Sequence, residues 1–302
     1  LEDDERVAAT VAARARRHRL RRLASVREEP APAETTGDPA TGATHLALAK
    51  QTRRLQAIEF ELRKARDQQR QMLPEVPALD DYRFRVLYEP CSEISGDFYD
   101  FIDLGDGKIG IAIGDVTGHG VTAALLMTMA KKVLHLVART AGSPAEALVR
   151  ANREICGDVD KTTFVTLFYG VLDSRAGHLR YVRAGHEPLV LFNPERPTPL
   201  QSFRPTGIAL GLQSSRVFES TLQEADLTLV PGDLFFLYTD GLVEATDLEG
   251  NEFGRERLDE TFLSRPQWVP DALVEHLYGK VTSLSPGRPL ADDLTLLAFR
   301  YR

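Results

Sequence analysis

The chain has 302 residues, of which 43% are hydrophobic and 27% charged, and its formal net charge is -7. This composition indicates a globular protein with a sizeable core, and the acidic balance argues against a nucleic-acid binder, because phosphate backbones recruit basic faces. Cys91 and Cys156 stand far apart without metal-site spacing, so neither a disulfide framework nor a zinc site is expected. No signal segment or membrane-length apolar run is evident, which predicts a cytoplasmic protein without membrane insertion.

The first 44 residues combine a charged segment with a linker. Residues 1–28 predict a charged helix, and residues 30–44 contain prolines and glycines without apolar periodicity, as is typical of a flexible linker. Disorder of the whole segment 1–44 is the alternative.

Residues 45–75 predict a helical coiled-coil linker. Its apolar residues follow a heptad pattern, with Leu48, Leu55 and Leu62 in one series and Ile58, Ala65 and Met72 in the other. Such an apolar stripe needs a partner, and we expect its own copy in a homodimer. Packing on its own globular domain is the alternative. The linker also suggests an upstream sensor domain, whose signal it would transmit.

From residue 76 the pattern changes to short apolar strands separated by turns. The strands are expected near 84–90, 97–104, 108–116, 164–173, 178–185, 233–240 and 294–301, and helices near 120–139, 144–156, 254–264 and 270–284. Strands that come in runs, with helices in pairs, favour antiparallel sheets over a βαβ alternation. The predicted fold class is α+β, an αββα sandwich of two antiparallel sheets flanked by helices.

Several aspartates stand where an expected strand meets a turn: Asp97, Asp115, Asp240, Asp292 and Asp293. A buried strand rarely ends in a carboxylate unless something neutralises the charge. The repeated carboxylates therefore predict a shared cation, and oxygen ligands without nearby His or Cys favour Mg²⁺ or Mn²⁺ over zinc. Such a cluster can hold two ions with an activated water between them.

Each aspartate also has a simpler interpretation. Asp240 could belong to an ordinary turn, and Asp115 could cap the helix that follows it. The set as a whole favours the metal site, because glycines 96, 114, 118, 120 and 241 are expected to clear the space that a substrate needs.

Seven ordered segments extend this interpretation. They are GDFYD (96–100), IGDVTGHGVTAALLM (113–127), FVTLFYGVLD (164–173), AGHEP (184–188), GIALGL (207–212), PGDLFFLYTDGLVEA (231–245) and DDLTLL (292–297). In order and spacing they resemble the bacterial SpoIIE-type serine phosphatases, a branch of the metal-dependent type 2C protein phosphatases. The resemblance runs from about Gln71 to the end of the chain and implies a phosphatase domain over 76–302, with two Mn²⁺ or Mg²⁺ ions between the sheets.

The resemblance also implies roles for single residues. Asp115 would bridge the two metals, and the backbone carbonyl of Val116 would bind one of them. Asp240 and Asp292 would complete the other, and Asp97 would bind directly or through water. Asp293 is the alternative to Asp292, because many relatives carry Asn at that place.

Six further positions are less certain from sequence. Ser95 stands where relatives usually carry glycine and could narrow the approach to Asp97. His119 is a candidate general acid, although this branch often carries Lys there. His186 is expected to be structural, and His135 is expected to be a packing or surface residue. Thr239 and Thr295 would either support the neighbouring aspartates or simply fill their strands.

The implied reaction is hydrolysis of a phosphoserine or phosphothreonine monoester by a metal-bridging water. The implied substrate is a phosphorylated anti-sigma-factor antagonist, a STAS-type protein of a partner-switching pathway. A catalytically silent dimeric regulator with the same fold is the alternative. A two-metal cyclase or nuclease is disfavoured, because the sequence has no P-loop motif and no basic stripe.

Overall fold

The computed structural model describes residues 39–118, 120–157, 159 and 162–302. The chain divides into two compact units, Leu1–Arg70 and Gln71–Arg302. The charged helix expected over 1–28 and the first part of the expected linker lie outside the described residues.

The described residues of the first unit form a long helix, α2 (Pro39–Gln71). It covers most of the segment expected to be helical from the heptad pattern but begins at Pro39 instead of His45, so the last residues of the expected linker are helical. The coiled coil stays a prediction. Leu48, Leu55 and Ile58 are 60%, 53% and 48% exposed in the single chain. Apolar side chains that are exposed at this spacing are typical of a helix with a partner, and the homodimer stays a prediction.

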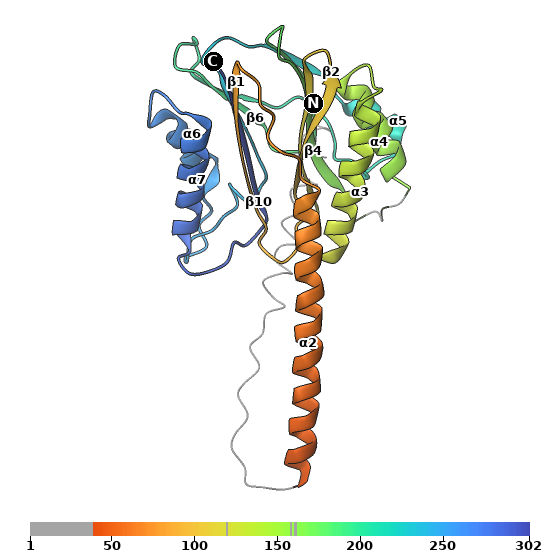
Figure 1. Ribbon diagram of the computed structural model, residues 1–302. Helices are drawn as coiled ribbons and strands as arrows, with labels where there is room; N and C mark the ends of the chain where they lie inside the picture. Colours follow the sequence, from red (N-terminus) through yellow and green to blue (C-terminus); the bar gives the residue numbers. More distant parts are fainter. Residues whose placement is uncertain (1–38, 119, 158, 160–161) are drawn as a thin grey trace. The chain divides into compact units, whose positions relative to one another are not determined.

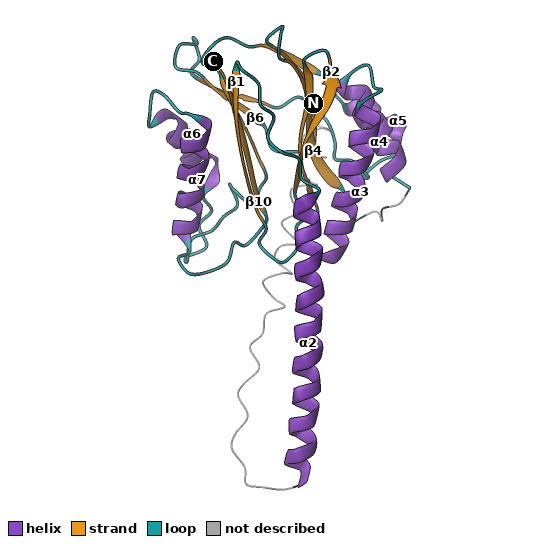
Figure 2. Cartoon of the chain, viewed as in Figure 1, coloured by secondary structure: helices purple, strands orange, loops and turns teal. Residues whose placement is uncertain are grey.

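The second unit is built on two five-stranded antiparallel sheets (Figures 1 and 2). The first sheet has the order β1-β10-β9-β6-β7, with β1 (Tyr82–Glu89), β10 (Leu294–Tyr301), β9 (Leu234–Tyr238), β6 (Leu189–Phe192) and β7 (Leu200–Phe203). The second has the order β2-β3-β4-β5-β8, with β2 (Phe98–Gly105), β3 (Lys108–Val116), β4 (Val165–Asp173), β5 (His178–Ala184) and β8 (Ala225–Thr228).

Helices cover the outer face of each sheet (Figure 2). On the side of the second sheet lie α3 (Val121–Ala138), α4 (Pro144–Ile155) and α5 (Ser215–Thr221). On the side of the first sheet lie α6 (Gly254–Leu263) and α7 (Pro270–Leu284). The arrangement confirms the predicted αββα sandwich.

The layers are held together by alternate residues of each strand. Ile111, Ile113 and Phe168 point inward from the second sheet. They join Phe235 and Phe299 of the first sheet, whose rings stack with centroids 4.7 Å apart. Burying each such side chain contributes about 1.5–3 kcal/mol, so this inner layer fixes the two sheets face to face.

The helix α3 is long and apolar enough to cross a membrane by length and composition, which the sequence analysis did not expect. Its stripe of Ala123, Ala130 and Leu134 is buried in the layer against the second sheet. The helix is also joined to β2 by the buried Asp100, which lies 2.7 Å from Lys131 Nζ and 2.9 Å from His135 Nδ1. Of the two roles expected for His135, the structure shows the packing role.

Three strands and one helix were not predicted: β6, β7, β8 and α5. Each of these strands has four residues, and α5 has seven. Elements of this length contain too few repeats for a periodicity of 2 or 3.6 to stand out.

Candidate metal centre

The strand-end aspartates gather at one end of the sandwich. Asp115 is near the end of β3, and Asp97 directly precedes β2. Asp240 follows β9 shortly, and Asp292 and Asp293 precede β10. Because β2 pairs antiparallel with β3, and β9 with β10, the end of one strand lies beside the start of the next. The topology therefore brings together carboxylates that are far apart in sequence.

Asp97 connects the two sheets. Its side chain is 1% exposed, and its Oδ2 accepts hydrogen bonds from Thr239 Oγ1 at 2.8 Å and Thr295 Oγ1 at 2.7 Å. Both threonines belong to the first sheet side, whereas Asp97 leads into the second sheet. Of the two roles that the sequence left open for these threonines, the structure shows the supporting one, because both hydroxyls donate hydrogen bonds to Asp97.

The neighbours Asp292 and Asp293 have different environments. Asp293 is 4% exposed, and its two carboxylate oxygens accept from the backbone N–H groups of Cys91 at 2.9 Å and Gly96 at 2.8 Å. Asp292 is half-buried, and its Oδ1 accepts from the backbone of Asp293 at 3.0 Å. Asp293 thus fastens the loop before β2 with both of its oxygens.

Burial and mutual repulsion raise the pKa of two carboxyls well above the ordinary aspartate value. For Asp115 the cause is loss of solvation, followed by the nearby charge of Asp240 and then of Asp97. For Asp97 the cause is burial, followed by Asp293, and the hydroxyls of the two threonines oppose the shift. Carboxylates held this close cannot all be ionised unless a cation compensates their charge.

The donor set fits a hard divalent cation. Most of the candidate ligand atoms are carboxylate oxygens. The carbonyl oxygen of Val116 lies close to the loop before β2, because a Cβ added to Gly96 in that loop would lie 3.1 Å from it. The Sγ of Cys91 also lies within 4.8 Å of ligand oxygens of Asp292 and Asp293. No local sequence signal marks Cys91 as part of the site, because the contact of its loop with the distant Asp293 brings it there.

The glycines do not all act as the sequence predicted. A Cβ on Gly241 would lie 2.0 Å from the carbonyl oxygen of Asp293, and one on Gly114 would lie 2.7 Å from the Phe98 ring. These glycines permit close packing within the protein, so their expected role of clearing the substrate's path is wrong. Gly118 and Gly120 have φ of 98° and 77° with open space at the Cβ position, and these two match that expectation.

The remaining site predictions have mixed outcomes. Ser95 is fully buried, and its Oγ accepts from the backbone N–H of Asp97 at 3.0 Å, so it shapes the turn instead of narrowing the approach. His119 lies outside the described residues. His186 is 3% exposed and lies 3.0 Å from Thr166 Oγ1, a contact that sequence analysis missed.

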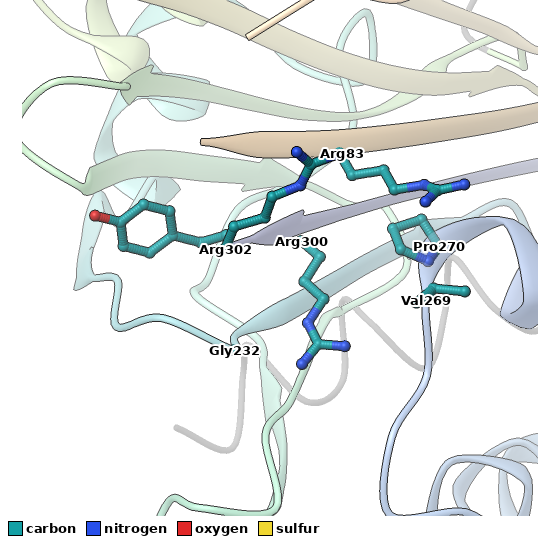
Figure 3. A pocket seen from close by; sticks show the side chains of 7 residues that line it. Arg83, Gly232, Val269, Pro270, Arg300 and Arg302 are labelled. Atoms are coloured by element: carbon teal, nitrogen blue, oxygen red, sulfur yellow. The ribbon is translucent and has the colours of Figure 1, made fainter. Parts of the chain in front are cut away.

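A separate cavity of about 260 Å³ lies at the other end of β10 (Figure 3). Arg83, Arg300 and Arg302 line it together with Pro270 at the start of α7. Asp292 and Asp293 directly precede the first residue of β10, whereas Arg300 is the residue before its last. The cavity is therefore separate from the cluster of aspartates at the other end of the strand.

The chain is similar to proteins of known family. The model of the Stage II sporulation protein E (SpoIIE) family matches residues 105–302. Protein IcfG of Synechocystis sp. is 30% identical over 271 residues, which are 79% of this chain and 41% of IcfG. Phosphoserine phosphatase RsbU of Bacillus subtilis is 29% identical over 250 residues, which are 82% of this chain and 72% of RsbU. The chain thus spans less than half the length of IcfG.

A solved structure shows the same fold. The SiaA-PP2C domain of Pseudomonas aeruginosa superposes with a TM-score of 0.71 at 22% identity, covering 82% of this chain and 98% of that domain. The family model matches well over half of the chain, and the matched residues include Asp115, Asp240, Asp292 and Asp293. The chain therefore belongs to the SpoIIE family, the RsbU-like branch of the type 2C protein phosphatases.

Proposed function

We propose that this chain is a metal-dependent phosphoprotein phosphatase that hydrolyses a phosphoserine or phosphothreonine monoester. The observation that carries the proposal is the convergence of Asp97, Asp115 and Asp240, where burial and then the charges of neighbouring aspartates raise the pKa of the first two. The name of RsbU, a phosphoserine phosphatase, supports the substrate class.

The site would hold two Mn²⁺ or Mg²⁺ ions. Asp115 is the residue whose carboxylate is influenced by every other member of the cluster, which supports its role as the bridging ligand. Asp240, Asp292 and the Val116 carbonyl would complete the coordination, with Asp97 binding directly or through water. Because Asp293 already accepts two backbone N–H groups, the structure favours Asp292 over Asp293 as ligand. When bound, the ions would activate water and stabilise the negative charge that develops on the phosphoryl group.

The chain's own residues would position the substrate and the ligands. Thr239 and Thr295 hold the Asp97 carboxylate in one orientation. The helix α3 begins at Val121 without a side-chain cap, so the backbone N–H groups of its first turn can face an anionic phosphate. The open space at Gly118 and Gly120 leaves room for a phosphorylated side chain to approach.

The substrate that we propose is a phosphorylated STAS-type protein of a partner-switching pathway. The support is the family itself and the similarity to RsbU. We also propose that α2 pairs with its copy in a homodimer and transmits a signal from an upstream sensor into the phosphatase unit. The exposed apolar residues of α2 support this arrangement.

The decisive experiment measures Mn²⁺-dependent phosphate release from p-nitrophenyl phosphate and from a phosphoserine protein. Wild type is compared with Asp115→Asn, and with Asp106→Asn as a control in the β2–β3 turn. We expect turnover that requires Mn²⁺, persists in Asp106→Asn and falls by more than about 100-fold in Asp115→Asn, because the bridging charge is lost. Folded wild type that binds Mn²⁺ but has no turnover on either substrate would instead indicate the catalytically silent regulator.

A further inference from the structure

His186 occupies a buried position beside the strand opposite Asp115. It lies in the AGHEP turn that follows β5, and its Nδ1 is 3.0 Å from Thr166 Oγ1. Thr166 is the direct partner of Asp115 in the antiparallel register of β3 and β4. Directly paired residues of neighbouring strands project from the same face of a sheet. The ring of His186 therefore supports the residue that stands beside Asp115.

The turn that carries His186 is held in one conformation. Gly185 has φ of 71°, and its N–H donates to the Gly207 carbonyl at 2.8 Å. The Arg183 guanidinium donates to the carbonyls of His186 and Pro205. A Cβ on Gly207 would lie 2.1 Å from the Arg183 carbonyl oxygen, so the two segments cannot separate or slide without losing this fit.

The other ring nitrogen faces the first sheet. Nε2 is buried and has no hydrogen bond of normal geometry among the residues that the structure describes, and the nearby acceptor is the Tyr238 carbonyl. Burial and the charge of Arg183 lower the pKa of His186 to about 3. The imidazole is therefore neutral at physiological pH. A proton on Nε2 can face Tyr238, which leaves Nδ1 to accept from the Thr166 hydroxyl.

We propose that His186 is a positioning residue for the metal centre. Through Thr166 it contacts the strand beside Asp115, and through Tyr238 it reaches the end of β9, two residues before Asp240. It thus connects the two sheets at the end where the carboxylates must converge. Through its contact with Thr166 and its packing near Tyr238, the buried ring would keep Asp115 and Asp240 at the spacing that two cations need.

This inference rests on the proposed metal-dependent function, and its test measures metal affinity directly. The full chain is compared with His186→Ala, His186→Asn and Thr166→Val, and with His178→Gln as a control at the far end of β5. Isothermal titration gives the Mn²⁺ dissociation constant without substrate. Phosphate release from p-nitrophenyl phosphate gives the Mn²⁺ activation constant and kcat, and thermal unfolding of the metal-free protein reports stability.

We expect His186→Ala and Thr166→Val to weaken Mn²⁺ binding by about tenfold or more, as is usual when a residue that orients a metal ligand is lost. Saturating Mn²⁺ should restore most of kcat. His186→Asn, which keeps an acceptor for the Thr166 hydroxyl, should fall between these variants and wild type, and His178→Gln should match wild type.

A lower melting temperature with an unchanged Mn²⁺ dissociation constant would overturn the proposal, since His186 would then only fill the core. If His186→Ala does not fold, the isosteric Thr166→Val tests the proposal instead, and an unchanged Mn²⁺ dissociation constant in that variant would overturn it. Wild type that binds Mn²⁺ without turnover refutes the enzyme proposal alone, and the affinity comparison still stands. Wild type that does not bind Mn²⁺ refutes both.

Discussion

Asp97 and Asp115 are the residues whose chemistry depends most on their surroundings. After burial, the strongest charge influences on the pKa of Asp115 are Asp240 and Asp97, and the strongest on that of Asp97 is Asp293. The protein thus holds together groups that repel one another when ionised, which costs folding stability. Such an arrangement is typical of a functional site, where binding of the ligand compensates the cost.

This arrangement predicts a pH-dependent response to metal. Because folding raises the pKa of both carboxyls, the metal-free protein loses stability as pH rises from the ordinary aspartate range through the raised values. Metal binds the ionised form and removes that loss. We therefore expect Mn²⁺ to increase the melting temperature more at pH 7.5 than at pH 5.5, as measured by thermal unfolding.

The control for this prediction is Asp115→Asn, in which one of the two titrating groups is absent and the pH dependence should shrink. An equal increase in melting temperature at both pH values would contradict it, because metal binding would then be independent of these carboxyls.

At the scale of elements, the loop after β9 and the start of β10 form one packed unit. The backbone of Gly241 lies directly against the carbonyl of Asp293, and Thr239 N donates to the Thr295 carbonyl at 3.1 Å. Asp293 in turn fastens the loop before β2 through Gly96. The loop before β2, the loop after β9 and the start of β10 are therefore joined by close contacts next to the carboxylates.

A methyl group at position 241 should disrupt this unit. In Gly241→Ala the new Cβ would lie 2.0 Å from the Asp293 carbonyl oxygen, so the backbone must shift. We expect the free energy of unfolding to fall by about 1–3 kcal/mol, in the range of other overpacked sites. Metal affinity should fall as well, since Asp240 and Asp292 would move apart. Urea denaturation and Mn²⁺ titration measure the two effects.

The matched control is Gly279→Ala in the interior of α7, where no atom lies within 4 Å of the added carbon. Alanine is a better helix former than glycine, so this variant should gain up to about 1 kcal/mol. Equal stability of the two variants would show that the contact at Gly241 is not tight in solution.

At the scale of the whole molecule, the second unit (Gln71–Arg302) buries the apolar side chains of its αββα core within itself. In contrast, α2 has apolar side chains that are exposed in the single chain. An amphipathic helix in a protein gains most of its stability when its apolar face packs against a partner. A second copy of α2 would provide that packing, and in a dimer it would also couple two phosphatase units.

The double variant Leu55→Asp, Leu62→Asp tests this coupling. Placing charges on the heptad stripe should convert a dimer to a monomer, because the charges would be buried against one another. Sedimentation velocity measures the state, with Gln56→Asp, Gln68→Asp as a control of equal charge outside the stripe. A wild-type protein that is already monomeric, or a double variant that remains dimeric, would count against the coiled coil.

The sequence alone determined the fold class and the identity of the acidic residues. Long strands such as β3, β4 and β10 carry enough alternating apolar residues to be recognised. An aspartate at the end of a buried strand is conspicuous because burying its charge without a partner costs free energy. The four-residue strands β6, β7 and β8 escaped, since their pairing depends on neighbours that are distant in the chain.

Only the tertiary structure decided how these residues work together. It distinguished Asp293, which binds two backbone N–H groups, from its neighbour Asp292, and it showed that Gly241 packs against the chain instead of clearing space for a substrate. It also placed His186 beside the partner of Asp115. These relations join residues that are far apart in sequence, and a local pattern cannot encode which distant groups will share the same few ångströms.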